Sequence, residues 1–309
     1  MEDTKECGLL RETTNVQTTM KSRIGLKHLR PRSVTALAPA ITPNGAVKGC
    51  RLIYAPRGQA FEYAPLATNP YRGCGHICVY CYVPLVTKQP RDEFNAGAVL
   101  RPNFLAELRK EAAKYEAAGI TEQVMLSFTT DPYHPGDTTP TRTVLETLSE
   151  HGLAVCTLTK GGTRALRDLD LFRPDRDAFA CTLTSLDDQF SKMWERDAPL
   201  PGDRIAALQV FHSAGIFTWV SLEPTLDVES SLAIVEATHD FVDLYKVGRA
   251  NYLKEITRTA DWGDYTRRMI ALFNRVGAKH YIKKDLQPFL PPGYPNPLRI
   301  PQNHARGMS

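Results

Sequence analysis

From about residue 62 onward, the chain alternates between short apolar runs and longer amphipathic stretches. Apolar runs of the length typical of buried strands occur at 123–129, 153–159, 178–184, 216–222, 241–247 and 279–283. Between them, apolar residues recur with helical spacing at 104–117, 141–151, 203–214, 229–238 and 262–275. The order strand, helix, strand, helix predicts repeated units around a parallel sheet.

About seven strands are expected when the segment that leads into residue 74 is counted as the first. The pattern therefore predicts an α/β fold, a partial (β/α)6 barrel of the TIM type, whose chemistry lies at the carboxyl ends of its strands. An open doubly wound sheet is the alternative, although no GxGxxG turn follows any strand. We expect a basic, partly disordered N-terminal extension at 1–61, the barrel at 62–285 and a Pro-rich C-terminal tail at 286–309.

The composition is that of an ordinary globular protein, with 309 residues, 42% hydrophobic and 23% charged, which excludes disorder as the dominant state. No apolar run approaches the roughly 18 residues that a membrane span needs. The first ten residues, MEDTKECGLL, lack the apolar core of a secretory signal. These features predict a cytoplasmic protein with no membrane partner.

Positive charge is concentrated near the N-terminus. The net charge is +4, but residues 1–60 hold ten basic and four acidic side chains, and 13–61 contain no acid. One interpretation is a solvated tail that keeps the protein soluble. The other is contact with the phosphates of a nucleic acid through residues 21–57.

Three of the seven cysteines, Cys74, Cys78 and Cys81, lie within eight residues. An odd number of cysteines with such crowding favours a reduced compartment and a ligand role. Three thiolates this close can hold one centre while leaving a fourth position open, and sulfur ligands select zinc or an iron-sulfur cluster. A closed zinc site would need His76 as its fourth ligand, in a tight alternation that strains tetrahedral geometry.

The cysteine loop, NPYRGCGHICVYCY at 69–82, resembles the opening motif of the radical S-adenosylmethionine superfamily, and most closely its spore photoproduct lyase-like branch. The resemblance continues over about 62–285, through SFTTDPYHP, LTKGGTRALRDLDLF, CTLTSLD, DRIAALQVFHSAGI and VGRANYL. It implies one 4Fe-4S cluster with an open iron that binds S-adenosylmethionine, and reductive cleavage to a 5′-deoxyadenosyl radical that abstracts hydrogen from a substrate. A low-potential electron donor of the flavodoxin or ferredoxin type is implied as a partner.

The resemblance also implies the site residues. Cys74, Cys78 and Cys81 are the expected cluster ligands. The expected residues around S-adenosylmethionine are Tyr80, Tyr82, Thr129, Thr130, Asp131, Lys160, Thr182 and Thr184. Each has an ordinary alternative, since aromatic residues pack loops, Asp-Pro begins turns and threonine is common in strands. Glu223 is expected to be a substrate ligand or to pair with Lys246 or Arg249. Arg249 and Asn251 are expected to lie at the same end of the barrel as these cofactor-binding residues.

The chain departs from spore photoproduct lyase at the end of the second strand, where 125–131 contain no cysteine to donate hydrogen. Repair of thymine dimers by the same mechanism is therefore in doubt. Cys156 and Cys181 are alternative radical partners or, as buried strand cysteines usually are, small core residues. The catalytic residues and the substrate are not assigned. A nucleic acid is the first hypothesis for the substrate, and a small molecule or peptide is a comparable one.

Two further classes of function stay open. In the first, the loop holds zinc or a cluster without catalysis, and the basic segment binds nucleic acid. In the second, a different barrel enzyme uses His134, Asp131 and Glu223 as acid-base groups.

Overall fold

The computed structural model describes residue 42 and residues 45–296. The chain divides into two units, 1–37 and 38–309, and all described residues belong to the second. The predictions for 1–41, 43–44 and 297–309 therefore lie outside the described residues. No helix in the described part of the chain is both long and apolar enough to cross a membrane.

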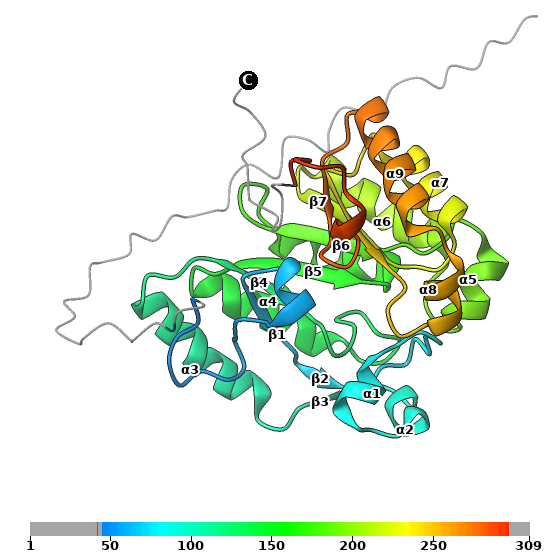
Figure 1. The fold of residues 1–309 in the computed structure, drawn as a ribbon. Helices are drawn as coiled ribbons and strands as arrows, with labels where there is room; N and C mark the ends of the chain where they lie inside the picture. The colour runs from blue at the N-terminus through cyan, green and yellow to red at the C-terminus, as the bar shows by residue number, and fades with distance from the viewer. Residues whose placement is uncertain (1–41, 43–44, 297–309) are drawn as a thin grey trace, which may run out of the picture. The chain divides into compact units, whose positions relative to one another are not determined.

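Seven parallel strands form the main sheet, in the order β1-β4-β5-β6-β7-β8-β9 (Figure 1). Their bounds are β1 Leu66–Thr68, β4 Gln123–Leu126, β5 Ala154–Thr159, β6 Ala178–Thr182, β7 Phe217–Thr225, β8 Leu244–Arg249 and β9 His280–Ile282. Within this sheet each strand pairs with the strand that follows it in the order given, and β1 and β9 are the two edges. The sheet is thus open, which confirms the predicted partial barrel.

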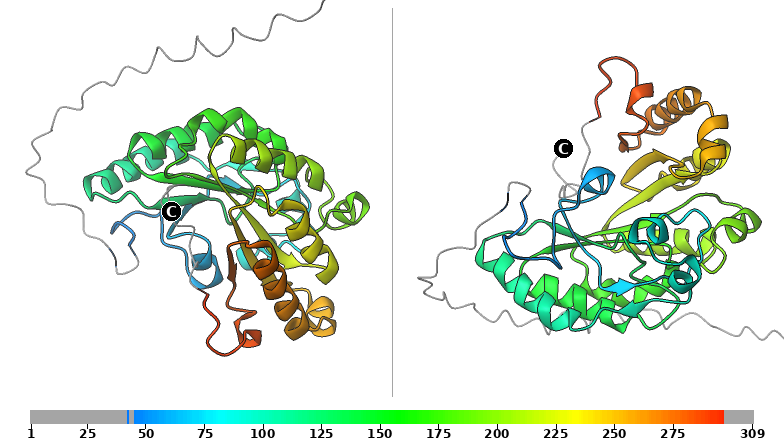
Figure 2. Two further views of the ribbon diagram at one scale, coloured as in Figure 1. Left: turned by 90° about the horizontal axis from the view of Figure 1, so that it is seen from above. Right: turned by 60° about the horizontal axis from the view of Figure 1, so that its bottom comes forward.

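Helices connect the strands on one side of the curved sheet (Figure 2). They are α3 Phe104–Ala117, α4 Thr139–Glu150, α6 Pro201–Ser213, α7 Val228–Thr238 and α9 Trp262–Val276, with the 3-10 helix η2 Gly162–Leu171 between β5 and β6. The five predicted helices are therefore confirmed to within two residues. Local signals mark the starts of two of them: the side chains of Asp227 and Asp261 accept backbone N–H bonds as the N-caps of α7 and α9.

Smaller elements carry the cysteine loop and the mouth of the barrel. They are η1 Gly58–Glu62, β2 Tyr71–Arg72, α1 Val83–Thr87, α2 Arg91–Asn95, β3 Val99–Leu100, α5 Asp188–Trp194, α8 Lys254–Thr259 and η3 Gln287–Phe289. Strands β2 and β3 pair in an antiparallel ribbon that leads into and out of the loop segment.

The alternation of strand residues separates two apolar layers. Val124, Phe179 and Val220 pack outward against the helices, whereas Met125, Cys156 and Trp219 belong to a smaller cluster on the other face. Small residues of the inner layer, Cys156, Ala178 and Ala180, lie on β5 and β6 in the middle of the sheet.

The segment that precedes the barrel is hydrogen-bonded to side chains of α3. The carboxylate of Glu111 accepts the N–H groups of Arg51, Leu52 and Ile53 at 2.8, 2.8 and 2.9 Å. The hydroxyl of Tyr115 accepts the N–H of Val47 at 3.2 Å. Ordered packing thus begins well before residue 62, inside the predicted extension, because a helix of the barrel supplies acceptors for its backbone.

The described part of the Pro-rich tail covers the edge of the sheet. Asn296 exchanges two hydrogen bonds with the backbone of Ile282 on β9, at 2.9 and 2.7 Å. These two bonds give partners to the backbone N–H and C=O of Ile282, which an exposed edge strand would leave without hydrogen bonds from the protein.

Candidate active site around the cysteine loop

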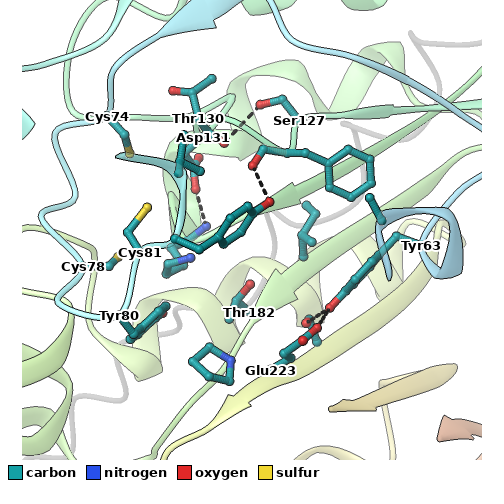
Figure 3. A pocket seen from close by; sticks show the side chains of 18 of the residues that line it. Tyr63, Cys74, Cys78, Tyr80, Cys81, Ser127, Thr130, Asp131, Thr182 and Glu223 are labelled. Carbon is teal, nitrogen blue, oxygen red and sulfur yellow. Dashed lines mark hydrogen bonds between the residues drawn. The ribbon is translucent and has the colours of Figure 1, made fainter. Parts of the chain in front are cut away.

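A cavity of about 740 Å³ opens at the carboxyl ends of the strands, within the size range of small-molecule sites. It has two ends (Figure 3). The cysteine side chains lie at one end, and Tyr63 and Glu223 lie at the other.

Most of the predicted site residues meet in this cavity. Its lining includes Cys74, Cys78, Cys81, Tyr80, Tyr82, Thr130, Asp131, Lys160 and Thr182. Thr129 and Thr184 do not line it. The backbone N–H of Thr129 instead donates to Asn69 Oδ1 at 3.0 Å, which turns the chain away at the end of β4. Thr184 is buried beyond β6.

Close backbone contacts set the path of the cysteine loop. Gly73 has φ +78°, and a Cβ there would lie 2.1 Å from the carbonyl oxygen of Gly97, so only glycine fits. The N–H of Cys74 donates to Phe94 O at 2.8 Å. The guanidinium of Arg91 donates to the carbonyls of Cys78 and Cys81 at 3.3 and 2.9 Å. These bonds hold the two cysteines from outside the cavity.

Burial raises the pKa of all three thiols, and that of Cys74 reaches about 12. Protonated thiols are poor ligands, so a positively charged centre has to displace their protons when it binds.

His76, the residue that a closed zinc site would need as its fourth ligand, makes its contacts away from the cysteines. It is buried, its Nδ1 lies 3.4 Å from Asp131 Oδ2, and its Nε2 lies 3.5 Å from Arg164 Nη1. In the described parts of the chain, no group of three or more His, Cys, Asp or Glu side chains is arranged to hold a single metal ion. The donor set therefore fits a three-cysteine cluster better than a closed zinc site.

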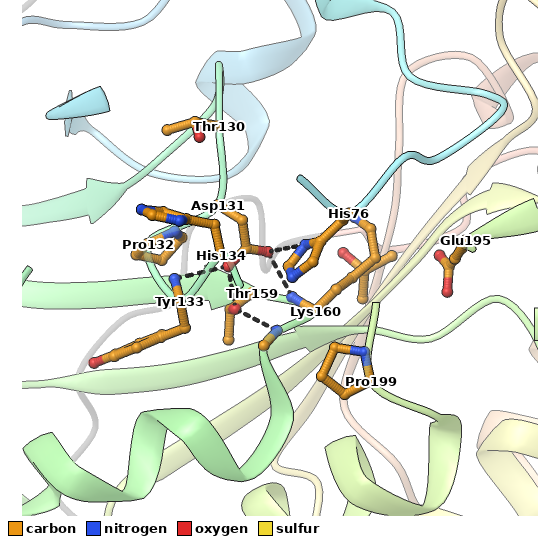
Figure 4. Close-up of polar contacts among 12 residues, drawn as sticks. His76, Thr130, Asp131, Pro132, Tyr133, His134, Thr159, Lys160, Glu195 and Pro199 are labelled. Carbon is orange, nitrogen blue, oxygen red and sulfur yellow. Dashed lines mark hydrogen bonds and ion pairs between the residues drawn. The ribbon is translucent and has the colours of Figure 1, made fainter. Parts of the chain in front are cut away.

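Asp131 connects the ends of two strands to the cysteine loop (Figure 4). Its Oδ1 accepts from the backbone N–H of Tyr133 at 2.8 Å and from the hydroxyl of Thr159, and its Oδ2 accepts from the backbone N–H of Lys160 at 2.8 Å. Burial alone would raise the pKa of Asp131, but His76 and Lys160 outweigh it and hold the pKa well below its ordinary value. Asp131 is thus an ionised acceptor whose oxygens already serve the chain's own donors.

A buried ion pair lies behind the loop. Arg204 Nη2 on α6 lies 2.5 Å from Glu195 Oε2, and both side chains are almost inaccessible to solvent. The hydroxyl of Tyr80 donates to the other oxygen of Glu195, and the backbones of Cys78 and Glu195 form an isolated antiparallel bridge. The pair therefore fixes the middle of the cysteine loop against α6.

Lys160 lies between these groups. Its Nζ is 5.8 Å from the centroid of the Tyr80 ring. Burial would lower the pKa of Lys160, but Cys78, Glu195 and Asp131 outweigh it and raise the pKa. The cavity therefore contains a permanent cation near the cysteines.

At the opposite end, Glu223 on β7 accepts hydrogen bonds from Tyr63 and Lys283, and from Asn251 at 3.2 Å. This corrects the predicted pairing of Glu223 with Lys246 or Arg249. The Nζ of Lys246 instead donates to the carbonyls of Glu62 and Tyr63 at 2.7 and 3.0 Å.

A glycine on β8 makes this cluster possible. A Cβ on Gly248 would lie 3.0 Å from both Glu223 Cδ and Lys283 Cδ, so the two side chains meet across its bare backbone. Asn251 lines the cavity as expected, whereas Arg249 is not among the lining residues.

The sequence did not predict four residues of these clusters, Tyr63, Lys283, Glu195 and Arg204. Tyr63 and Lys283 lie 160 and 60 positions along the chain from Glu223. Glu195 lies only nine positions from Arg204, and Arg204 belongs to the DRIAALQVFHSAGI segment, but neither residue is marked there as half of an ion pair. The one signal in the sequence was Arg204, a cationic residue on the otherwise apolar face of α6, which indicates that a buried acid lies opposite it.

The two strand cysteines face opposite layers. The sulfur of Cys156 accepts from Trp219 Nε1 at 3.3 Å on the inner side, and Cys181 packs in the outer core. Neither lines the cavity, so both are core residues here.

Curated relatives match part of the chain. One uncharacterized protein from Mycobacterium bovis and two from Mycobacterium tuberculosis are each 29% identical over 168 residues, which is 51% of this chain and 48% of the relative. The chain thus spans about half the length of the curated relatives it matches.

Solved structures show the same fold. A mutant of spore photoproduct lyase is similar with a TM-score of 0.59 and 13% identity, over 81% of this chain and 87% of that one. Streptococcus suis SuiB bound to S-adenosylmethionine is similar with a TM-score of 0.55 and 11% identity, over 73% of this chain and 52% of that one. Residues 68–231, more than half of the chain, match the sequence family described as the radical SAM superfamily. The chain belongs to the radical SAM superfamily.

Proposed function

We propose that this chain holds one 4Fe-4S cluster through Cys74, Cys78 and Cys81 and binds S-adenosylmethionine beside it. Membership of the superfamily supports both cofactors. The observation that carries the proposal is the donor set: three cysteines line one end of the cavity, and the one histidine among the described lining residues faces Asp131. Such a set leaves one iron for an outside ligand.

When bound, the reduced cluster supplies the electron that cleaves S-adenosylmethionine to methionine and a 5′-deoxyadenosyl radical, which abstracts hydrogen from the substrate. The chain's own residues orient and shield this chemistry. Lys160, a cation near the cysteines, suits the carboxylate of the methionine group. Tyr80, Tyr82, Thr130 and Thr182 supply ring faces and hydroxyls along the same wall.

Asp131 has a second role in this proposal. Because its oxygens accept bonds from Thr159, Tyr133 and Lys160, it holds the ends of β4 and β5 in register with the loop. Its negative charge also favours the ammonium of the methionine group at this wall. Neither Thr129 nor Thr184 lines the cavity. A contact of either residue with S-adenosylmethionine stays a prediction.

The test is anaerobic reconstitution with iron and sulfide, reduction with dithionite, and measurement of 5′-deoxyadenosine by mass spectrometry. The wild type is expected to bind about four irons and to release 5′-deoxyadenosine. Cys78→Ala is expected to lose both properties. Cys50→Ala, a matched change outside the cavity, is expected to keep them. A colourless protein that binds one zinc would refute the proposal.

For the substrate, we propose a nucleic acid whose base enters the end of the cavity around Tyr63 and Glu223. Aromatic rings of Tyr63 and Phe128 lie beside hydrogen-bonding groups of Glu223, Lys283 and Asn251, a mixture that suits a planar, polar ring. A neighbouring structure, spore photoproduct lyase with a dinucleoside spore photoproduct, has the same fold, with 14% identity and a TM-score of 0.57.

Arg57 connects the basic segment to the cavity, because it belongs to 21–57 and also lines the cavity. Binding of single-stranded oligonucleotides, followed by fluorescence anisotropy, should weaken as salt rises. Arg57→Ala is expected to lower the slope of log K against log salt by about 0.7. Arg258→Ala, an exposed arginine on α8 outside the lining, should not change it. Undetectable binding to DNA and RNA would leave a small molecule or peptide as the substrate.

A further inference from the structure

The hydrogen bonds at the Tyr63 end of the cavity decide which polar atoms are left for a ligand. Glu223 accepts from Tyr63 and Lys283 through Oε2, and Figure 3 shows the ring of Tyr63 directed at Glu223. The side chain of Lys283 is 1% exposed, and its Nζ also lies 3.3 Å from the hydroxyl of Tyr63. The protons of Tyr63 and Lys283 therefore serve groups of the protein.

Two further donors at this end are used in the same way. Burial, together with the charge of Glu223, raises the pKa of Tyr63 well above its ordinary value, so this hydroxyl keeps its proton and donates it to Glu223. Ser221 Oγ lies 3.1 Å from the Tyr63 hydroxyl and has to be the donor of that pair. The hydroxyl of Tyr82 donates to the carbonyl of Phe128 at 3.1 Å.

Asn251 presents an acceptor. Its Nδ2 donates to Asp285 Oδ2 at 2.7 Å and to Glu223 Oε1 at 3.2 Å. The opposite orientation of the amide would place Oδ1 against both carboxylates, so these contacts fix the orientation. Both amide protons are thus used, and Asn251 Oδ1 has no hydrogen-bond partner among the residues that the structure describes. Because Asn251 lines the cavity, this oxygen is available to a ligand.

The capacity that remains at this end is a pair of neighbouring acceptors. One is Asn251 Oδ1, and the other is Glu223 Oε1, which accepts one bond and has a second lone pair. Arg57 and Gln59 also line the cavity, but both are exposed and serve its entrance. A ligand that fills this end therefore has to bring two adjacent donors.

We propose that the nucleic-acid base bound between Tyr63 and Glu223 is guanine. This inference rests on the proposed function, in which a base enters the cavity at this end. Guanine carries two adjacent donors, N1–H and the 2-amino group, which match Glu223 Oε1 and Asn251 Oδ1.

The other bases lack this pair of donors. Adenine and cytosine place a ring-nitrogen acceptor beside their amino group, and thymine and uracil flank a single N–H with two carbonyls. Each would bring an acceptor against Glu223 or Asn251 and leave a buried polar atom without a donor, which a site built for hydrogen bonding rejects strongly.

The test measures the base preference of the reconstituted protein. Short fluorescent oligothymidylates carry one central deoxyguanosine, one central deoxyinosine or no substitution, and binding at moderate salt is followed by anisotropy. Deoxyinosine keeps N1–H and lacks only the 2-amino group. The variants are Asn251→Ala, which removes one acceptor, and Glu223→Gln, which puts an amide nitrogen in place of Oε1. The matched control is Asn274→Ala on the exposed side of α9, and melting temperatures show whether each variant is folded.

We expect wild type to bind the deoxyguanosine oligonucleotide at least about fivefold more tightly than the unsubstituted one, with deoxyinosine between them. Asn251→Ala and Glu223→Gln should reduce this preference to within twofold, and Asn274→Ala should keep it. The comparison within wild type decides the base even if a variant fails to fold.

Two outcomes would overturn the choice of guanine alone, because nucleic-acid binding would persist. They are equal or reversed affinities of wild type for the three oligonucleotides, and a guanine preference that the folded variants retain. If wild type binds none of the oligonucleotides, the nucleic-acid substrate of the proposed function is wrong as well.

Discussion

The buried pair of Glu195 and Arg204 allows a quantitative test of how the cysteine loop is held. Replacing Arg204 by Met keeps most of the side-chain volume but removes the ion-pair partner of the buried Glu195, which then retains only Lys160 as a cationic neighbour. Breaking a buried ion pair in this way costs about 3–5 kcal/mol of unfolding free energy. In a domain of this size that corresponds to a fall in the melting temperature on the order of 10 °C.

A second substitution separates charge from packing. Adding Glu195→Gln to Arg204→Met removes both charges, while the amide oxygen still accepts the hydroxyl of Tyr80. The double variant is therefore expected to regain about half or more of the lost stability, since the cost comes mainly from the unpaired charge. Urea denaturation followed by circular dichroism gives the unfolding free energies.

The control is an exposed pair with similar hydrogen bonding. Arg268 donates twice to Glu229, at 2.6 and 2.7 Å, on the surface. Arg268→Met should leave the melting temperature close to wild type, because water replaces the lost partner. The reasoning fails if Arg204→Met is as mild as Arg268→Met, or if Glu195→Gln does not improve the stability of Arg204→Met.

Three further predictions concern the loop, the edge of the sheet and the N-terminal segment. Gly73→Ala should sharply reduce iron loading, because the new Cβ would collide with Gly97 O. The control is Gly119→Ala, which has a similar φ but open space around the new Cβ and should keep the iron loading of wild type. Equal iron loading in the two variants would contradict this prediction. Burial lowers the pKa of His280, whose ring stacks on Phe273 at 4.3 Å. The unfolded chain therefore takes up this proton first, and stability should fall as pH drops below about 6.5. His280→Phe should show a shallower loss between pH 7 and pH 5 by thermal denaturation, and an unchanged slope would refute the assignment. Glu111→Ala removes the acceptor of three N–H groups. Limited proteolysis should then cut near residues 50–53 faster than in wild type, and an unchanged digestion pattern would count against this contact.

The cysteine loop and the order of elements were predictable from the sequence because both depend on local pattern. Strand and helix periodicities report which side of each element is buried, and the spacing of Cys74, Cys78 and Cys81, together with the other matched segments, predicts a three-ligand site. On β6, Cys181 packs in the outer core and Thr182 lines the cavity, as the alternation of side chains along a strand requires.

The partners across the barrel were decided by the tertiary structure. Tyr63 and Glu223 are 160 positions apart, and Glu223 and Lys283 are 60 apart. Which of several lysines reaches Glu223 depends on strand register and on the bare backbone of Gly248, and no local pattern encodes either. Glu195 and Arg204 are only nine positions apart, but their pairing also depends on the fold, since a charge can be buried only where the fold delivers its counter-charge. Periodicity in the sequence thus determined the scaffold and cysteine spacing predicted the ligand set, whereas tertiary packing chose the charged groups that surround the cysteines.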